Sequence, residues 1–174
     1  MKSARQGRMI LSRGFRLLVG EKTLLKAIIF DLGNTLVSQD TGRALPFAVE
    51  VLEELRGRYK LAAVTNTLSD LTAEDVRGIL GEAGVPDVFD VIVVSSEVGV
   101  SKPEPGIFEL ALEGLGVGPG EALMVGNTVS TDVFGGNRVG MMTVLVQPGE
   151  EYRRSEWETP DHTVGSLKDL LELV

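Results

Sequence analysis

Short apolar runs alternate with longer mixed stretches along most of this chain. Each run is too short for a helix and rich in Val, Ile, Leu or Phe, a composition typical of strands buried on both faces. The stretches between them carry apolar residues at helical spacing, which predicts amphipathic helices. Because strands and helices alternate, we expect an α/β fold with a parallel sheet covered on both faces. The predicted strands are 27–30, 61–64, 91–94, 123–125 and 143–146.

Capping and stop residues mark the ends of the predicted helices. Pro46 and Pro105 suit the first turns of two of them. Thr72 and Asp75 have the spacing of a capping box. The helices are predicted over 45–59, 72–83, 105–115, 131–138 and 167–173, with glycines 84, 116 and 140 as stops. The buried face of the second is predicted to be Val76, Ile79, Leu80 and Ala83. Residues 147–161 have the polar composition of a surface loop. A short edge strand over 162–164 is a further possibility.

The composition is that of one ordinary globular domain. The chain has 174 residues, of which 43% are apolar and 24% charged. A formal net charge of −8 argues against general nucleic-acid binding. The absence of cysteine excludes disulfides and thiolate chemistry. No apolar run approaches the roughly 18 residues needed to cross a membrane, so we expect no transmembrane segment and a cytoplasmic protein.

The first 25 residues differ from the rest, because basic residues precede the first acid, Glu21. We expect a flexible basic arm at 1–25, followed by the globular domain at 26–174. A translation start at Met9 is one alternative origin for this arm, and a weak anchor for anionic lipid is an alternative role. The basic residues are Lys2, Arg5, Arg8, Arg13 and Arg16.

Four of the predicted strands are followed by polar residues that could form a site. Asp31 follows the first strand and is succeeded by the turn residue Gly33. The carboxyl ends of parallel strands are where α/β sheets bind ligands. Taken alone, Asp31 could equally be a turn residue or helix cap. The other polar stretches are Thr65-Asn66, Ser101-Lys102-Pro103 and the segment from Gly126-Asn127 to Asp132.

In order, these stretches resemble the four motifs of the haloacid dehalogenase (HAD) superfamily. The most specific are Ser101 to Phe108 and Val125 to Met141, with Asp31-Leu32-Gly33-Asn34-Thr35-Leu36 less so. The family consists mostly of magnesium-dependent phosphatases and phosphotransferases that work through an aspartyl-phosphate. The resemblance covers residues 26–174. It implies a three-layer Rossmann-like fold with five parallel strands in the order 5-4-1-2-3, and a HAD-like hydrolase domain.

The resemblance also assigns roles to individual residues. Asp31 would be the covalent nucleophile, since an acyl phosphate is itself labile. Thr65, Asn66 and Lys102 would bind the phosphoryl group, with Thr65 and Lys102 also catalytic. An ordinary strand-end threonine and a solvated surface lysine are the alternatives for Thr65 and Lys102. A Mg²⁺ ion would be held by Asp31, the Gly33 carbonyl, Asn127 and Asp132, a set of oxygen ligands that this ion prefers.

Two positions depart from the family pattern. Most HAD phosphatases carry an acid two residues after the nucleophile, where this chain has Gly33. General acid–base catalysis is worth about 10²- to 10⁴-fold, so we expect a slow enzyme. Glycine at this position would fit a positive φ or a close backbone approach to the metal. Asn127 stands where an aspartate ligand is usual, so Asp132 would supply the negative charge.

The intervals between the motifs leave no room for a cap domain. About 34 positions separate Asp31 from Thr65, and about 37 separate Thr65 from Lys102, each filled by predicted core elements. The site is therefore expected to be open. An open site suits a bulky, lipid or macromolecular phosphate, or a homo-oligomer in which a neighbouring copy covers it. Residues 131–141 also look like the capless phosphatidylglycerophosphate phosphatases, although Gly33 does not fit that branch.

The sequence thus predicts a magnesium-dependent phosphatase for phosphate monoesters. Receiver domains use a similar residue set, but their acceptor Asp follows the third strand, whereas Asp31 follows the first. A degenerate HAD domain that serves as a non-catalytic phospho-binding or scaffold module remains the alternative, because of Gly33 and Asn127.

Overall fold

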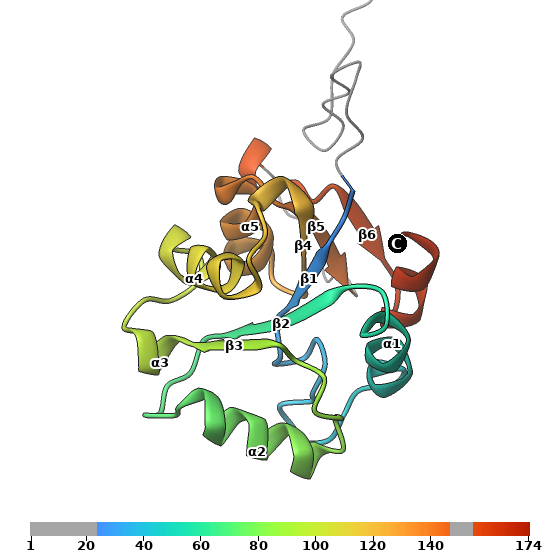
Figure 1. Cartoon of the computed structure of the whole chain (residues 1–174), viewed down its shortest axis with the longest axis vertical. Coiled ribbons are helices and arrows are strands. Elements are labelled where there is room, and N and C mark those ends of the chain that lie inside the picture. Colours follow the sequence, from blue (N-terminus) through green and yellow to red (C-terminus); the bar gives the residue numbers. More distant parts are fainter. Residues whose placement is uncertain (1–23, 147–154) are drawn as a thin grey trace, which may run out of the picture.

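Six parallel strands form one sheet at the centre of the protein (Figure 1). The computed structural model describes residues 24–146 and 155–174. The predicted parallel sheet is confirmed, and its first five strands have the expected order. The predicted number of five strands is wrong, because residues 162–164 add a sixth along β5. The strands lie in the order β3 (Val91–Val94), β2 (Lys60–Thr65), β1 (Ala27–Phe30), β4 (Ala122–Gly126), β5 (Met142–Val146) and β6 (His162–Val164).

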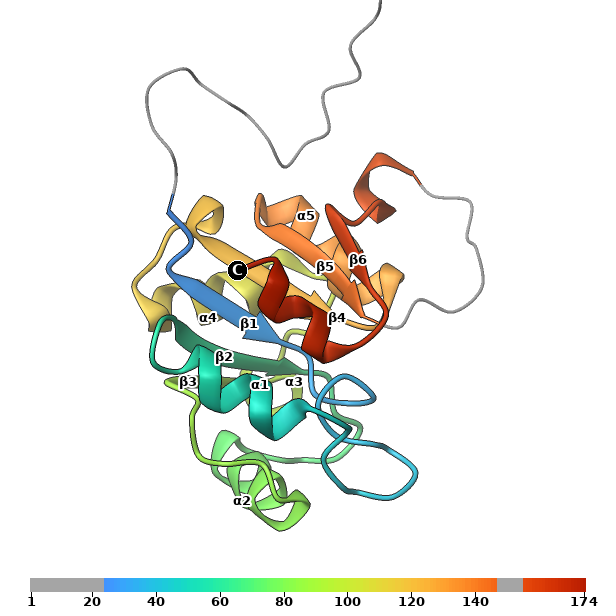
Figure 2. The ribbon, with the colours of Figure 1, turned by 90° about the vertical axis from the view of Figure 1, so that its right-hand side faces the viewer.

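Helices cover both faces of this sheet (Figures 1 and 2). Successive residues of β1 face opposite sides, so Ile28 and Phe30 belong to one core cluster and Ala27 and Ile29 to the other. The first cluster packs under α1 (Ala48–Leu55), α2 (Ala73–Ala83) and the 3₁₀ helix η4 (Leu167–Glu172). The second packs under α4 (Pro105–Leu115) and borders α5 (Phe134–Val139). The remaining short helices are α3 (Ser95–Val98), η1 (Pro119–Glu121), η2 (Val129–Val133) and η3 (Glu156–Glu158).

The capping box at the start of α2 is confirmed. The Thr72 hydroxyl accepts a hydrogen bond from the Asp75 N–H, and the Asp75 carboxylate accepts one from the Thr72 N–H. Gly84 ends the helix in a left-handed conformation, as predicted. The predicted apolar face is wrong at Ile79, which is 46% exposed. Its spacing suits a broad apolar stripe, but only Val76, Leu80 and Ala83 reach the sheet.

Four other helical segments differ from prediction. The first begins at Ala48 and not around Pro46, because Phe47 adopts a left-handed φ of 67° that no helix can contain. The short α3 after β3 was not predicted. The segment predicted as one helix over 131–138 is a π-helical turn, η2, that runs directly into α5. The last predicted helix, 167–173, is the 3₁₀ helix η4.

Two predicted features lie largely outside the described residues. These are the basic arm, of which only Leu24 and Leu25 are described, and residues 147–154 of the predicted loop 147–161. Within the described part of the chain, no helix has the length and apolarity required to cross a membrane.

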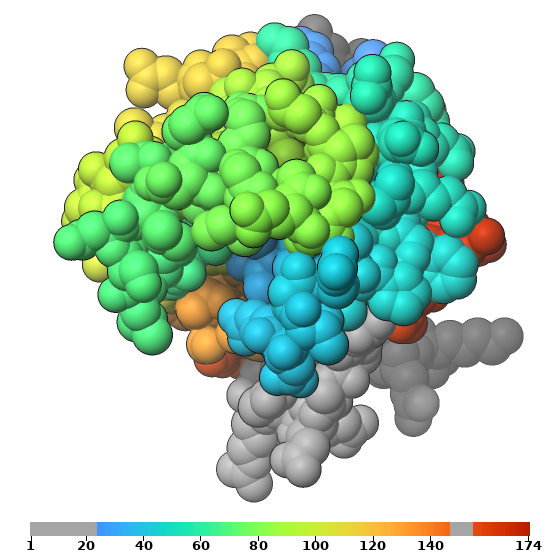
Figure 3. Space-filling model, turned by 90° about the horizontal axis from the view of Figure 1, so that it is seen from below, coloured from blue at the N-terminus to red at the C-terminus, as the bar shows by residue number. Residues whose placement is uncertain are grey.

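The strand register brings the predicted motifs to one edge of the sheet. Phe30 pairs with Ala63 on one side and with Val125 on the other. Asp31 therefore lies beyond the end of β1, level with the last residues of β2 and β4. In Figure 3, which views this edge, the darker blue part of the chain after β1 is visible between neighbouring segments.

Candidate active site

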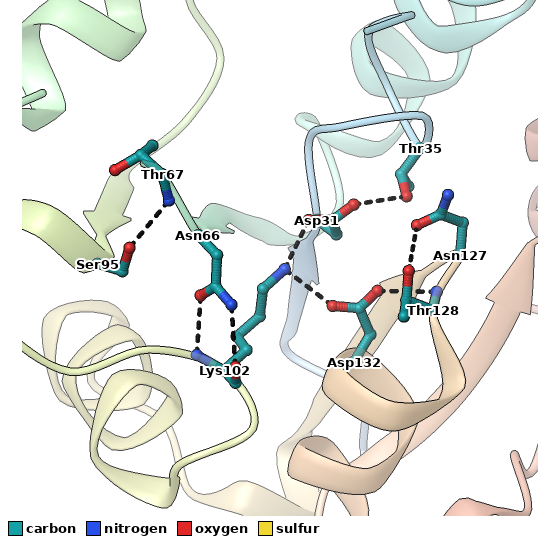
Figure 4. Close-up of polar contacts among 9 residues, drawn as sticks. All are labelled: Asp31, Thr35, Asn66, Thr67, Ser95, Lys102, Asn127, Thr128 and Asp132. Carbon is teal, nitrogen blue, oxygen red and sulfur yellow. Dashed lines mark hydrogen bonds and ion pairs between the residues drawn. The ribbon is translucent and has the colours of Figure 1, made fainter. Parts of the chain in front are cut away.

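Three charged side chains from three segments meet at the carboxyl edge of the sheet (Figure 4). The Lys102 Nζ lies 2.5 Å from Asp31 Oδ1 and 2.8 Å from Asp132 Oδ1. The exposed fractions of these side chains are 3% for Lys102, 11% for Asp31 and 2% for Asp132. A single buried ammonium group therefore bridges two carboxylates that are far apart in the sequence.

The turn after β1 holds Asp31 in place. The Asp31 N–H continues the sheet by donating to the Val125 carbonyl at 2.9 Å. The chain then closes around the Leu32 carbonyl, which accepts from the N–H groups of Thr35, Leu36 and Val37. This turn directs the Thr35 hydroxyl back to Asp31 Oδ2 at 2.9 Å. Both carboxylate oxygens of Asp31 are thus fixed, one by Thr35 and one by Lys102.

Asn66 positions the backbone of Lys102. Its Oδ1 accepts a hydrogen bond from the Lys102 N–H at 2.8 Å, and its Nδ2 donates to the Lys102 carbonyl at 2.9 Å. One side-chain amide thereby satisfies both backbone groups, as a neighbouring strand would. The Lys102–Pro103 peptide bond is cis. These contacts engage one donor and one acceptor of the Asn66 side-chain amide. They do not involve a substrate, so a substrate-binding role for Asn66 stays a prediction.

Asp132 projects from the π-helical turn η2. Its Oδ2 accepts a hydrogen bond from the Thr128 N–H at 3.0 Å. Gly126, the last residue of β4, leaves the space for this carboxylate, because a Cβ on Gly126 would overlap it. Single π-helical turns are frequent at functional sites, where they redirect a side chain. Here the turn places Asp132 beside β1.

Burial and charge act against each other in this cluster. Burial by itself lowers the pKa of the Lys102 ammonium, but the adjacent Asp132 and Asp31 carboxylates outweigh it and raise the pKa above its ordinary value. Burial raises the pKa of Asp132, and Asp31 adds to this effect while Lys102 opposes it. When all three groups are ionised, two negative charges face one positive charge. The cluster then carries an excess negative charge in a largely buried place.

The donor set at this edge fits a divalent cation. Two carboxylates converge on one place, and their excess negative charge is what a cation would balance. Asn127, also predicted as a ligand, stands next to Thr128, whose hydroxyl donates to Asn127 Oδ1 at 3.0 Å. Gly33 lies in the turn after Asp31, where its carbonyl was predicted to bind the metal. The described residues hold no group of three or more His, Cys, Asp or Glu suited to a metal, so amide or carbonyl oxygens and water would have to complete the set.

Thr65 ends β2, next to β1 in the sheet, and is 8% exposed. The loop that follows it is tied to α3. The Thr67 N–H donates to Ser95 Oγ at 2.9 Å, and Ser96 Oγ donates to the Leu71 carbonyl at 2.7 Å. The unpredicted helix α3 therefore fixes the loop beside the predicted phosphate-binding residue.

The structure corrects one explanation for Gly33. This residue is not among the described glycines with positive φ, which are Gly42, Gly84, Gly99, Gly116 and Gly140. The residue of the turn that does adopt a left-handed conformation is Asn34, with a φ of 56°. A positive φ is therefore not the reason for glycine at position 33.

Sequence reasoning missed two residues that support the site. Thr35 and Thr128 donate hydrogen bonds to Asp31 and Asp132, respectively. Thr35 lies within the Asp31–Leu36 motif, and Thr128 lies between Asn127 and Asp132. Their position in a turn next to a predicted functional carboxylate was the available signal, because hydroxyl and N–H groups in turns commonly bond to carboxylates.

Comparison with known proteins gives a consistent result. A family model described as a haloacid dehalogenase-like hydrolase matches residues 37–140, which is more than half of the chain. The match begins just after the Asp31 turn and includes Lys102 and Asp132.

Two curated relatives illustrate the similarity. The pyrimidine 5′-nucleotidase YjjG of Escherichia coli is 39% identical over 131 residues, covering 75% of this chain and 56% of the relative. The phosphoserine phosphatase of Thermus thermophilus is 38% identical over 126 residues, covering 72% and 49%. This chain thus spans about half the length of the curated relatives it matches.

Solved structures share the fold. A HAD phosphatase from Thermococcus onnurineus has a TM-score of 0.73 and 25% identity, with 86% of this chain and 97% of that one covered. A dehalogenase described with an intermediate complex has a TM-score of 0.77 at 18% identity, over 88% and 99% of the two chains, and this likeness shows the fold alone. Together with the family match, these findings show that the chain belongs to the haloacid dehalogenase-like hydrolases.

Proposed function

We propose that this protein is a magnesium-dependent phosphatase that hydrolyses phosphate monoesters through an aspartyl-phosphate on Asp31. The observation that carries the proposal is the buried contact of Asp31 with Lys102 and Asp132 at the carboxyl edge of the sheet. The curated relatives include phosphatases that act on phosphoserine and on glyceraldehyde 3-phosphate, which supports phosphoryl chemistry at this site.

Asp31 is the nucleophile in this proposal. A carboxylate oxygen of Asp31 attacks the phosphorus, and the bond to the leaving oxygen breaks with its electron pair on that oxygen. Water then attacks the phosphorus of the acyl phosphate, which releases inorganic phosphate and restores the carboxylate. Thr35 and Lys102 keep the carboxylate oriented throughout, because each contacts one of its oxygens.

Lys102 offsets negative charge during the transfer. Its raised pKa keeps the ammonium protonated at neutral pH. Its Nζ already lies against the nucleophile, so the charge that develops on the phosphoryl oxygens meets a positioned cation. Thr65, and Asn66 through Lys102, would complete the phosphate-binding side of the site.

Asp31, Asp132, Asn127 and the Gly33 carbonyl would hold the Mg²⁺ ion. When bound, this ion supplies positive charge that allows an anionic phosphate to approach an anionic nucleophile. The excess negative charge of the two carboxylates over Lys102 supports this assignment.

In this proposal the site is open to a substrate that the protein does not enclose, and the short intervals between the first three strands support it. The described chain between β1 and β2 contains the Asp31 turn, a loop and α1, and between β2 and β3 it contains one loop and α2. Neither interval holds a folded unit that could cover Asp31 in this chain. A bulky phosphate ester, or coverage by a second copy of the chain, fits this arrangement.

A screen of phosphate esters tests the proposal. The full chain is assayed with 4-nitrophenyl phosphate, phosphoserine, nucleoside monophosphates and sugar phosphates, with Mg²⁺ and with excess chelator. We expect hydrolysis of at least the activated aryl ester, with release of inorganic phosphate only when Mg²⁺ is present. Full activity in chelator would contradict the metal site, and inactivity toward every ester would favour the non-catalytic alternative.

A further inference from the structure

Gln39 fills the space that a side chain at position 33 would occupy. A Cβ built on Gly33 would overlap the amide nitrogen Nε2 of Gln39 and lie 3.2 Å from its Cδ. Since Gly33 has no positive φ, its backbone conformation does not require glycine. What the missing side chain permits is the close approach of the Gln39 carboxamide.

Asn34 holds the carboxamide of Gln39 in this place. Asn34 Nδ2 donates to Gln39 Oε1 at 3.0 Å, and the Gln39 N–H donates to Asn34 Oδ1 at 2.9 Å. Asn34 is fixed in turn, because its N–H donates to the Val37 carbonyl at 2.7 Å. The oxygen of the carboxamide is therefore engaged, and its NH₂ group is the end that faces Gly33.

The NH₂ group of Gln39 is available to a ligand. In the part of the chain that the structure describes, its Nε2 makes no hydrogen bond. Gln39 is exposed and belongs to the segment that follows Asp31. In Figure 3 this light-blue segment lies beside the darker blue part of the chain that follows β1. A fixed donor thus stands beside the turn that carries the proposed nucleophile.

We propose that Gln39 is a substrate-binding residue whose NH₂ group donates a hydrogen bond to the leaving oxygen of the phosphate ester. This assignment rests on the proposed phosphatase function. When the bond between phosphorus and this oxygen breaks, the electron pair stays on the oxygen, which takes its proton from solvent. Gln39 keeps both of its protons and stabilises the negative charge as it develops. The stabilisation is greatest for poor leaving groups, which carry the most charge on that oxygen.

The dependence of the rate on the leaving group tests this assignment. The full chain, Gln39→Ala and the neighbouring control Asp40→Ala are assayed with Mg²⁺ on 4-nitrophenyl phosphate, phenyl phosphate and glycerol 2-phosphate. For Gln39→Ala we expect kcat/KM to fall about tenfold to a hundredfold on the last two esters, and by less than about threefold on the first. Asp40→Ala should retain the wild-type values. Equal losses on all three esters, or no loss, would overturn the assignment.

Gly33→Ala provides a second measurement at the same place. Its methyl group displaces the carboxamide, so the variant should show the same selective loss as Gln39→Ala. The double variant should lose no more than Gln39→Ala alone, because the two changes remove one interaction. Losses that multiply in the double variant would contradict a shared role.

Nuclear magnetic resonance separates this inference from the proposed function. In protein without metal or substrate, the Gln39 side-chain NH₂ signals are identified by their loss in Gln39→Ala. They should shift in Gly33→Ala and stay in place in Asp40→Ala. Unchanged signals in Gly33→Ala would overturn the geometry on which the assignment stands. A wild-type protein inactive on every ester would refute the phosphatase function and the Gln39 role with it, whereas an active one without leaving-group selectivity at Gln39 refutes only the latter.

Discussion

Two lysines of this protein pair with carboxylates in opposite surroundings. Lys102 is 3% exposed and lies between Asp31 and Asp132. Lys168 is 53% exposed and lies 3.3 Å from Glu50, which is equally exposed, and 5.1 Å from the centre of the Phe47 ring. Water solvates and screens the second pair, and such pairs are typically worth about 0–1 kcal/mol. The charged groups around Lys102 have lost most of their contact with water, so each charge is stabilised mainly by the other charges of the cluster.

This difference in burial indicates that a contribution to folding stability does not explain why the cluster around Lys102 is present. Buried ion pairs often contribute no more than apolar side chains of the same volume, because of the cost of desolvation. This cluster is less favourable still, since it has two carboxylates for one ammonium. Its arrangement is understandable if a cation and a phosphoryl group bind there, whereas Lys168 needs no such explanation. The following predictions use this contrast, from the largest expected effect to the smallest.

Asp31→Asn should abolish catalysis while the protein stays folded. The amide has the shape of the carboxylate but is a far poorer nucleophile, and it still accepts the hydrogen bond from Thr35. We expect turnover of 4-nitrophenyl phosphate to fall to the level of the blank, with thermal unfolding still cooperative. The control is Asp87→Asn on the surface, which should retain activity. Wild-type turnover in Asp31→Asn would eliminate Asp31 as the nucleophile.

Lys102→Met should lower both activity and stability. It leaves two buried carboxylates facing each other, and breaking a buried ion pair costs about 3–5 kcal/mol of unfolding free energy. The pKa of Asp132 is already raised by burial, and losing the ammonium raises it further. A carboxyl whose pKa is raised by folding stabilises the folded state at low pH and loses that contribution as the pH rises through its folded pKa.

The stability deficit of Lys102→Met should therefore shrink as the pH is lowered from 7 toward 3.8, the ordinary carboxyl value. Urea unfolding of the variant and the wild type at several pH values measures it. A deficit that is independent of pH would show that the two carboxylates are not the cause.

Asp132→Ala should weaken the response to Mg²⁺ more than Asn127→Ala does. Asp132 supplies a charged ligand, whereas Asn127 supplies a neutral amide oxygen. We expect the Mg²⁺ concentration for half-maximal activity to rise about 10- to 100-fold in Asp132→Ala, the range found when support of a metal site is lost, and clearly less in Asn127→Ala. The measurement is a Mg²⁺ titration of hydrolysis, with unfolding curves as the check on folding. An equal or reversed order would contradict the assignment of Asp132 as the main charged ligand.

Lys168→Met should have the smallest effect. The pair with Glu50 and the contact with the Phe47 ring are exposed, so we expect a change of no more than about 1 kcal/mol in unfolding free energy. Activity should equal that of the wild type, because Lys168 pairs with Glu50 and the Phe47 ring and not with the charged groups around Asp31. The variant is the matched control for Lys102→Met in the urea experiments. A loss comparable with that of Lys102→Met would remove the contrast between buried and exposed pairs.

The sequence by itself determined much of the fold. Buried apolar runs of four residues, such as 27–30 and 91–94, are too short for a helix and form their backbone hydrogen bonds in a sheet. The predicted first and last residues of both strands were correct. The capping box of Thr72 and Asp75 set the start of α2 by local hydrogen bonds alone. The position of Asp31, Lys102 and Asp132 after strands also followed from the sequence, because parallel strands present their carboxyl ends to one edge.

Other features depended on contacts between distant segments. The start of α1 was missed because the left-handed Phe47 precedes it, and β6 formed because β5 offered an unpaired edge. The hydrogen bonds that fix Lys102 come from Asn66, on a different strand end. The approach of Gln39 to Gly33 required the turn to fold back on itself. Local patterns encode hydrogen bonds between near neighbours and the side of an element that is buried. They do not encode which side chains from separate segments meet, since that is fixed only when the whole core packs.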